Sequence, residues 1–114
     1  MENSKKTAVI SQSTIGKPKE EILKNIENAI IWLGNHRYEV LGSFFEFDDP
    51  LLNIYDYKNI PLYYLSNFLK LMSKCDAIYF CNGWETLKSC RIEHRAAVEY
   101  GLELIYQEIE ELPW

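Results

Sequence analysis

Short apolar segments alternate with stretches of helical periodicity along this chain. The apolar segments are rich in residues that favour β-strands, and each is separated from the next by an amphipathic stretch long enough to cross back over a sheet. Such alternation is typical of right-handed βαβ units, in which helices cover both faces of a parallel sheet. We therefore expect an α/β fold with a parallel sheet of about four strands. The expected strands are 7–10, 38–43, 76–81 and 102–106, and the expected helices are 18–33, 61–72 and 89–100.

The size and charge of the chain narrow its possible functions. With 114 residues and no linker, repeat or low-complexity tract, residues 1–114 are expected to form one domain. Lys and Arg total 12 against 17 Asp and Glu, and the net charge of −5 disfavours binding to a nucleic-acid backbone. No apolar run reaches the roughly 18 residues of a membrane span, and no apolar block follows a basic start. We expect a soluble, cytoplasmic protein with no nucleic-acid or membrane partner.

The cysteines give little support for a disulfide framework or a metal site. Cys75, Cys81 and Cys90 are odd in number and include no CxxC pair. His36 and His94 do not stand at metal-ligand spacing from them. We expect three reduced thiols, two of which fill the core, and neither a bound metal nor another cofactor.

In an open parallel sheet, ligands bind beyond the carboxyl ends of the strands, where the strand order reverses. The loops expected to meet there are 11–16, the stretch from 43 onward and 82–89. The first loop contains four polar side chains, those of Ser11, Gln12, Ser13 and Thr14. Their hydroxyls and amide could hold a phosphate or a sugar, and a plain polar turn is the alternative. Because the loop has neither a GxGxxG nor a GxxxxGK pattern, a dinucleotide fingerprint and a P-loop are excluded.

The expected third helix carries a carboxylate on a mostly apolar stripe. Glu93 falls in line with Cys90, Ala97 and Tyr100 at helical spacing. At this position it would be partly desolvated, while the helix dipole would favour its charged form. Such a carboxylate suits a nucleophile or a stabiliser of a developing oxocarbenium ion. The alternative is a structural ion pair with Lys88, Arg91 or Arg95.

Several aromatic residues near the expected crevice also have two interpretations. Trp84 follows Gly83 where it could stack on a base, or it could cap the edge of the sheet. His94 points about 100° away from Glu93 around the helix, so the two are not expected to share a substrate atom. The stretch 44–60 has no clean period and is expected to be a long, functional loop. A ligand wall or a subunit contact, or else core packing, would account for Tyr55, Tyr57, Tyr63 and Tyr64.

The segment 74–106 resembles the small nucleoside 2-deoxyribosyltransferase-like proteins, and closest is an uncharacterised subgroup common in bacteria and phages. Their pattern is a Cys-Asp that opens a strand, a Gly-Trp-Glu, a turn of small residues, an Arg-x-Glu on a helix and a Gly before the last strand. The matching residues are Cys75, Asp76, Gly83, Trp84, Glu85, Arg91, Glu93 and Gly101. The N-terminal half agrees more loosely, through its strand, its polar loop, Asn25 and Ala29.

The resemblance implies a flavodoxin-like or Rossmann-like fold and aligns Glu93 with the nucleophile of these transferases and of related nucleotide N-hydrolases. In such enzymes the Glu attacks C1′ of a deoxyribonucleoside, the base departs, and an acceptor base or water takes the sugar. The substrate would be a nucleoside or nucleotide, with Glu93 as the catalytic residue and Trp84 near the base. The expected substrate-binding residues are Ser11, Gln12, Ser13, Thr14, Gly83, Trp84, Ser89 and Arg91.

The chain departs from the family pattern at three places. Residues 11–14 replace a Gly-Pro, and Ser89 and Cys90 replace a Gly and an Ala. The acid that family enzymes often carry in the preceding helix falls near Asn67 and Phe68, neither of which is acidic. These departures favour an alternative function, a non-catalytic protein that binds a nucleotide or a nucleotide-derived signal on the same fold.

The expected sheet is small, and the stretch 44–57 is strongly aromatic. A monomer would leave a shallow, open site and an apolar patch larger than soluble monomers usually expose. In the family, a neighbouring subunit commonly helps to close the pocket. We therefore expect a homo-oligomer.

Overall fold

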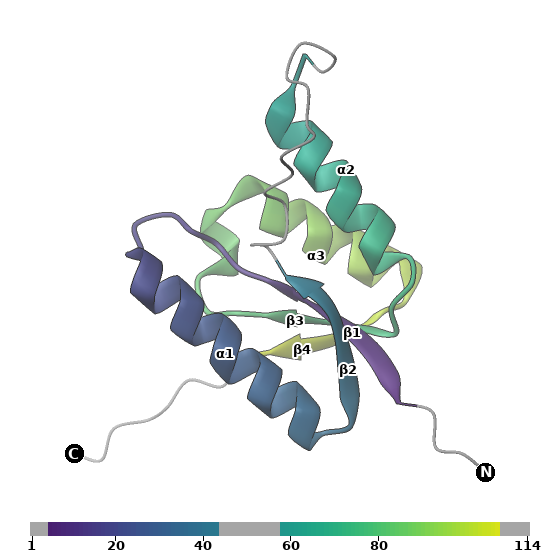
Figure 1. Cartoon of the computed structure of the whole chain (residues 1–114). Helices are drawn as coiled ribbons and strands as arrows, with labels where there is room; N and C mark the ends of the chain where they lie inside the picture. The colour runs from purple at the N-terminus through teal and green to yellow at the C-terminus, as the bar shows by residue number, and fades with distance from the viewer. Residues whose placement is uncertain (1–4, 44–57, 108–114) are drawn as a thin grey trace.

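A parallel sheet of four strands with helices on both faces makes up the protein, as a computed structural model shows (Figure 1). The structure describes residues 5–43 and 58–107. The elements in chain order are β1 (Lys6–Ser11), α1 (Lys19–Asn35), β2 (Tyr38–Ser43), α2 (Ile60–Met72), β3 (Ala77–Phe80), a 3₁₀ turn η3 (Trp84–Thr86), α3 (Lys88–Tyr100) and β4 (Glu103–Tyr106). The predicted α/β class and the predicted order of strands and helices are confirmed. Predictions about 44–57, including those for Tyr55 and Tyr57, lie outside the described residues.

The strands are ordered β2-β1-β3-β4, and every neighbouring pair is parallel. From β1 the chain steps to β2 on one side, then returns past β1 to β3 and β4 on the other. Because each β-α-β crossover is right-handed, connections that run in opposite directions along the sheet place their helices on opposite faces. Accordingly α1 covers one face, and α2 and α3 cover the other (Figure 1). The strand order reverses between β1 and β3, so their carboxyl ends mark the place where ligands bind in such folds.

The two faces of the sheet form two separate apolar clusters. On the α1 face, the helix contributes Ile22, Ile26, Ala29 and Leu33, which pack on side chains from β1, β3 and β4. On the other face, α2 and α3 contribute Phe68, Met72 and Ala97, which pack on Val9, Ile78 and Phe80. Every residue of β3 is buried. A strand covered on both faces reads as a continuous apolar run, which explains the sequence of this segment.

The helix ends follow from local sequence signals. Asn59 caps α2, since its side-chain oxygen accepts a hydrogen bond from the backbone N–H of Leu62 at 3.0 Å. Pro61 stands in the first turn of the same helix, where its missing N–H costs nothing. Gly101 ends α3 with a φ of +78°, a conformation that a side chain disfavours. These signals place the start of α2 and the end of α3.

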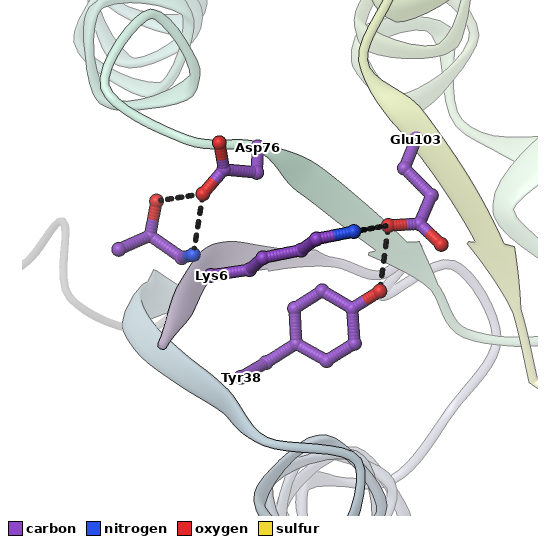
Figure 2. A network of polar contacts seen from close by, with 5 residues as sticks. Lys6, Tyr38, Asp76 and Glu103 are labelled. Carbon is purple, nitrogen blue, oxygen red and sulfur yellow. Dashed lines mark hydrogen bonds and ion pairs between the residues drawn. The ribbon is translucent and has the colours of Figure 1, made fainter. Parts of the chain in front are cut away.

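Polar side chains join all four strands at the end of the sheet where the strands begin, which we call the amino edge (Figure 2). The backbone N–H of Thr7 donates to Oδ2 of Asp76 at 2.8 Å, which ties the start of β1 to the start of β3. The Tyr38 hydroxyl on β2 donates to Oε1 of Glu103 on β4 at 2.6 Å, so the two edge strands are joined across the sheet. This hydrogen bond raises the pKa of Tyr38 to about 12. Lys6 adds an exposed ion pair to Glu103 at 3.8 Å. We call this group the amino-edge network.

The structure also bears on the expected burial of the thiols and on the expected absence of a membrane span. Cys81 and Cys90 are buried and Cys75 is half-buried, so two of the three thiols fill the core as expected. Within 5–43 and 58–107, no helix combines the length and the apolar character that crossing a membrane requires.

Candidate active site

Glu93 lies where β1 ends and the second turn of α3 begins to pack on the sheet. Ser11, the last residue of β1, donates its hydroxyl hydrogen to Oε1 of Glu93 at 2.6 Å. Both side chains are buried, with Ser11 2% and Glu93 5% exposed. The bond joins residues 82 positions apart in the sequence, at the reversal point of the strand order. The fold therefore holds one carboxylate in a set position at the expected ligand-binding edge.

Burial raises the pKa of Glu93 to about 7, although the hydrogen bond from Ser11 acts in the opposite direction. The sequence predicts a partly desolvated carboxylate whose charged form the helix dipole favours. Glu93 is the sixth residue of α3, beyond the first turn to which the dipole effect is confined. Desolvation therefore dominates, and the side chain is present in both protonation states near neutral pH.

The alternative interpretation of Glu93, a structural ion pair, is wrong for its arginine partners. Arg91 donates to the backbone carbonyl of Glu85 at 2.7 Å. Arg95 pairs with Glu99 at 2.8 Å, on the exposed side of α3. Among the described residues, no ion pair is formed by Glu93. Among these residues, the group that stabilises its negative charge is the Ser11 hydroxyl.

A cavity of about 270 Å³ lies against Glu93. This volume is close to the lower end of small-molecule sites, about 300 Å³. The polar lining comes from the β1 loop and α3, and the apolar lining comes mainly from α2. The lining residues are Thr14, Ile60, Pro61, Tyr64, Leu65, Phe68, Leu87, Ser89 and Glu93. Of the expected site residues, the structure brings Thr14, Ser89 and Glu93 together here.

The other polar residues of the β1 loop have structural partners. Gln12 donates to the backbone carbonyl of Ile22 at 3.1 Å and accepts from Asn25 at 2.8 Å, so it anchors α1 to the loop. The hydroxyls of Ser13 and Thr86 lie 2.7 Å apart and join the loop to η3. Neither Gln12 nor Ser13 lines the cavity. Their role in this structure is to hold the loop.

Three further expected binding residues also lie away from the cavity. The ring of Trp84 stacks on His94, with centroids 4.2 Å apart, and packs on Phe80 at 5.2 Å. The structure therefore favours the interpretation of Trp84 as a cap on the sheet. Gly83 adopts a φ of +90° and faces the ammonium of Lys17, which donates to the carbonyl of Asn82 at 2.7 Å. With Arg91 bound to the η3 backbone, this segment forms a braced turn.

Sequence reasoning missed most of the apolar wall. Ile60, Pro61, Leu65 and Leu87 line the cavity, and only Tyr64 among the lining residues of α2 had been considered as a ligand wall. In the sequence of α2, one apolar stripe is formed by Leu65, Leu69 and Met72 and another by Tyr64, Phe68 and Leu71, which predicts a helix covered on two sides. The stripes could not indicate that one of the covering surfaces is a cavity, because packing against a neighbour and facing a cavity need the same apolar residues.

The Ser11→Ala variant is expected to titrate Glu93 at a higher pH than the wild type. The Ser11 hydroxyl stabilises the carboxylate, so its loss raises the pKa of Glu93 further above its usual range. A hydrogen bond to a charged group is worth about 1.5 kcal/mol, which corresponds to about one pH unit. The side-chain carbonyl resonance of Glu93, followed by NMR over a pH series, measures the shift. Ser13→Ala removes a neighbouring hydroxyl that contacts Thr86 instead and serves as the control; an equal midpoint in all three proteins contradicts the assignment.

Neither a metal centre nor a known relative adds to this description. In the part of the chain that the structure describes, no three His, Cys, Asp or Glu side chains are grouped closely enough to hold a metal ion. Comparisons with family models, curated proteins and solved structures found no match to this chain.

Proposed function

We propose that the protein cleaves the N-glycosidic bond of a nucleoside or nucleotide, with Glu93 as the nucleophile. One observation carries the proposal. A buried carboxylate faces a cavity at the reversal point of the sheet, and a single hydroxyl orients it without neutralising its charge. A buried carboxyl without a cationic partner destabilises the fold when it ionises, a cost that functional sites commonly carry. The resemblance to nucleoside 2-deoxyribosyltransferase-like proteins, which aligns Glu93 with their nucleophile, agrees with this role.

In this proposal each site residue has its own role. Ser11 holds Oε1, so Oε2 is the oxygen that attacks C1′ of the sugar. As the bond to the base breaks, positive charge develops on the sugar, and a carboxylate in a dry site stabilises it strongly. Thr14 and Ser89 line the cavity, and we assign their hydroxyls to the sugar and the rings of Tyr64 and Phe68 to the base. Water or an acceptor base then releases the sugar from Glu93.

A panel of neutral nucleosides, N-alkylated nucleosides and their monophosphates, with free base followed by chromatography, tests the proposal. We expect base release with at least one member and none with the Glu93→Ala variant. If no member of the panel is cleaved, or if Glu93→Ala and the wild type behave alike, Glu93 is not the nucleophile of such an enzyme.

The absence of a second acid from the described lining supports a second candidate function. Among those residues, Glu93 is the only carboxylic acid. A domain that binds a nucleotide or a nucleotide-derived signal without cleaving it needs no acid for the leaving group. This alternative predicts saturable binding in calorimetry and intact ligand recovered after denaturation. Recovery of separate sugar and base would contradict it.

We also propose that the chain forms a homo-oligomer. Leu23, Ile30 and Ile31 are each about half exposed along one flank of α1. Lys24 and Glu27 border the same shallow groove, so a two-fold partner would meet both signs of charge. Light scattering at tens of micromolar is expected to give a multiple of the 13.5 kDa chain mass. A mass of one chain would contradict the proposal, and Ile31→Lys should shift the wild-type assembly towards that mass.

The proposed setting is the cytoplasm, and the proposed ligand is a small molecule. Three free thiols suit a reducing compartment. The net charge of −5 opposes contact with a nucleic-acid backbone.

A further inference from the structure

The described lining of the Glu93 cavity carries an unusual set of charges. It contains no Lys, Arg or His, and its one carboxyl belongs to Glu93. Two cations of the carboxyl edge are engaged elsewhere: Lys17 binds the carbonyl of Asn82, and Arg91 binds that of Glu85. An anionic ligand group would lose its hydration in this cavity and gain no counter-charge from the described lining. A positive charge on the ligand would meet the Glu93 carboxylate instead.

The same lining offers no strong acid that could protonate a departing base. Phe68 and Leu65 are buried on α2, where the cavity wall faces Glu93. The remaining ionisable group of the wall is the phenol of Tyr64, and phenols are much weaker acids than carboxyls. The base of a neutral nucleoside leaves as an anion unless an acid protonates it. A positioned general acid is typically worth a factor of about 10²–10⁴ in rate, which this wall does not supply through a carboxyl.

We propose that the substrate is a cationic N-glycoside, in which the base is a pyridinium or an N-alkylated purine that already carries a positive charge. The inference rests on the proposed function and deepens it by naming the substrate class. Such a base needs no proton in order to leave. Its charge is attracted to the carboxylate that attacks, and its flat ring suits the wall formed by Tyr64 and Phe68.

The reaction balances without any further group. Oε2 of Glu93 forms a bond to C1′ while the C1′–N bond breaks, and the bonding pair moves to the ring nitrogen and cancels the positive charge of the base. Water then adds to C1′ and displaces the Glu93 carboxylate, and the proton from water goes to solvent. The products are a neutral base, the free sugar and one proton.

The groups around Glu93 fit a site that works with a cation. Burial raises the pKa of the Cys90 thiol on α3 to about 12, so this neighbour stays neutral. On β1, Ser11 contributes a hydroxyl, and on α2 the facing ionisable group is the phenol of Tyr64. Among these described neighbours, Glu93 is the group whose ionisation sets the charge of the cavity. Bound cations favour its ionised, reactive form.

The sharpest test compares 7-methylguanosine with guanosine on the full-length wild-type protein. The two probes differ by one methyl group and one charge. We expect kcat/KM for base release, after subtraction of the spontaneous rate, to be at least about 100-fold higher for 7-methylguanosine, because guanosine lacks the help of an acid. Nicotinamide riboside, a second cationic probe, should be cleaved as well. Glu93→Gln should abolish both activities, while Glu99→Gln, on the exposed side of the same helix, should retain them.

The pH profile adds a second readout. With nicotinamide riboside, kcat/KM should rise as Glu93 ionises and then stay level up to pH 8.5. A falling alkaline limb would reveal a required acid and overturn the inference. Cleavage of guanosine and 7-methylguanosine at equal efficiency, or cleavage confined to neutral nucleosides, would also overturn it and leave the proposed function standing. No cleavage of any cationic or neutral member of the panel would instead overturn the proposed function.

Discussion

At pH 8.5 the Glu93→Gln variant is expected to be more stable than the wild type by about 3 kcal/mol. The pKa of Glu93 rises from 4.5 to about 7 on folding, because the buried carboxylate loses its hydration. Each unit of this shift costs about 1.4 kcal/mol once the group is ionised in both states. Gln resembles the protonated acid in size and in hydrogen bonding, and it avoids this cost at every pH.

The sign of the effect sets the pH window. Below pH 4.5 the side chain is protonated in the folded and unfolded states, and the two proteins should unfold alike. As pH rises from 4.5 to about 7, the unfolded chain releases the proton first, so the wild type loses stability relative to the variant. Above about pH 8 the difference should stay constant. Urea titrations at pH 4.5, 6, 7 and 8.5 measure it, with Glu99→Gln as the control. A variant less stable than the wild type at pH 8.5 would mean that the carboxylate has a stabilising partner.

The same substitution is expected to lower base release by about 10⁴-fold or more, the usual scale for removal of a nucleophile. The amide of Gln can accept the Ser11 hydrogen bond, but it cannot form the bond to C1′. Steady-state rates with the best substrate of the panel measure the loss at pH 8, where the wild-type carboxylate is ionised. Circular dichroism of both proteins controls for folding.

A second measurement separates chemistry from binding. The variant should still bind a neutral nucleoside with similar affinity, because the cavity wall is unchanged. Loss of turnover by less than tenfold would contradict the role of Glu93 as nucleophile. Taken together, the two effects place activity and stability in opposition at one side chain, as is common where a fold holds a reactive group in a dry site.

Helical spacing carried the prediction of the fold further than that of the site. In the sequence, Ile22, Ile26, Ala29, Ile30 and Leu33 recur at helical spacing, which predicts one buried face. The structure buries Ile22, Ile26, Ala29 and Leu33 on α1, whereas Ile30 is nearly half exposed. Helical spacing and turn-forming residues are local properties of the sequence. They therefore predict the elements without information on which elements pack together.

The partners in the site are long-range, and spacing does not report them. The placement of Glu93 on an apolar face was visible from the helix, but its hydrogen bond to Ser11 depends on which strand α3 covers. Likewise, the direction in which η3 turns Trp84, towards His94 and away from Glu93, is set by packing on Phe80. Gln12 has the chemistry of a ligand-binding residue, and only its contacts with Ile22 and Asn25 reveal its structural use.

The amino-edge network has a consequence for how chains of this kind should be classified. Asp76, one of the residues that carries the family resemblance, ties β1 to β3 at the edge of the sheet opposite to Ser11 and Glu93. A chain could therefore keep the Cys-Asp signature for the sake of its sheet and carry any residue, or any reaction, at position 93. Searches that weight Cys75 and Asp76 would collect proteins by architecture. Under the proposed function, sorting them by chemistry would rest on the pair formed by a hydroxyl at the end of β1 and a carboxylate on the second turn of α3.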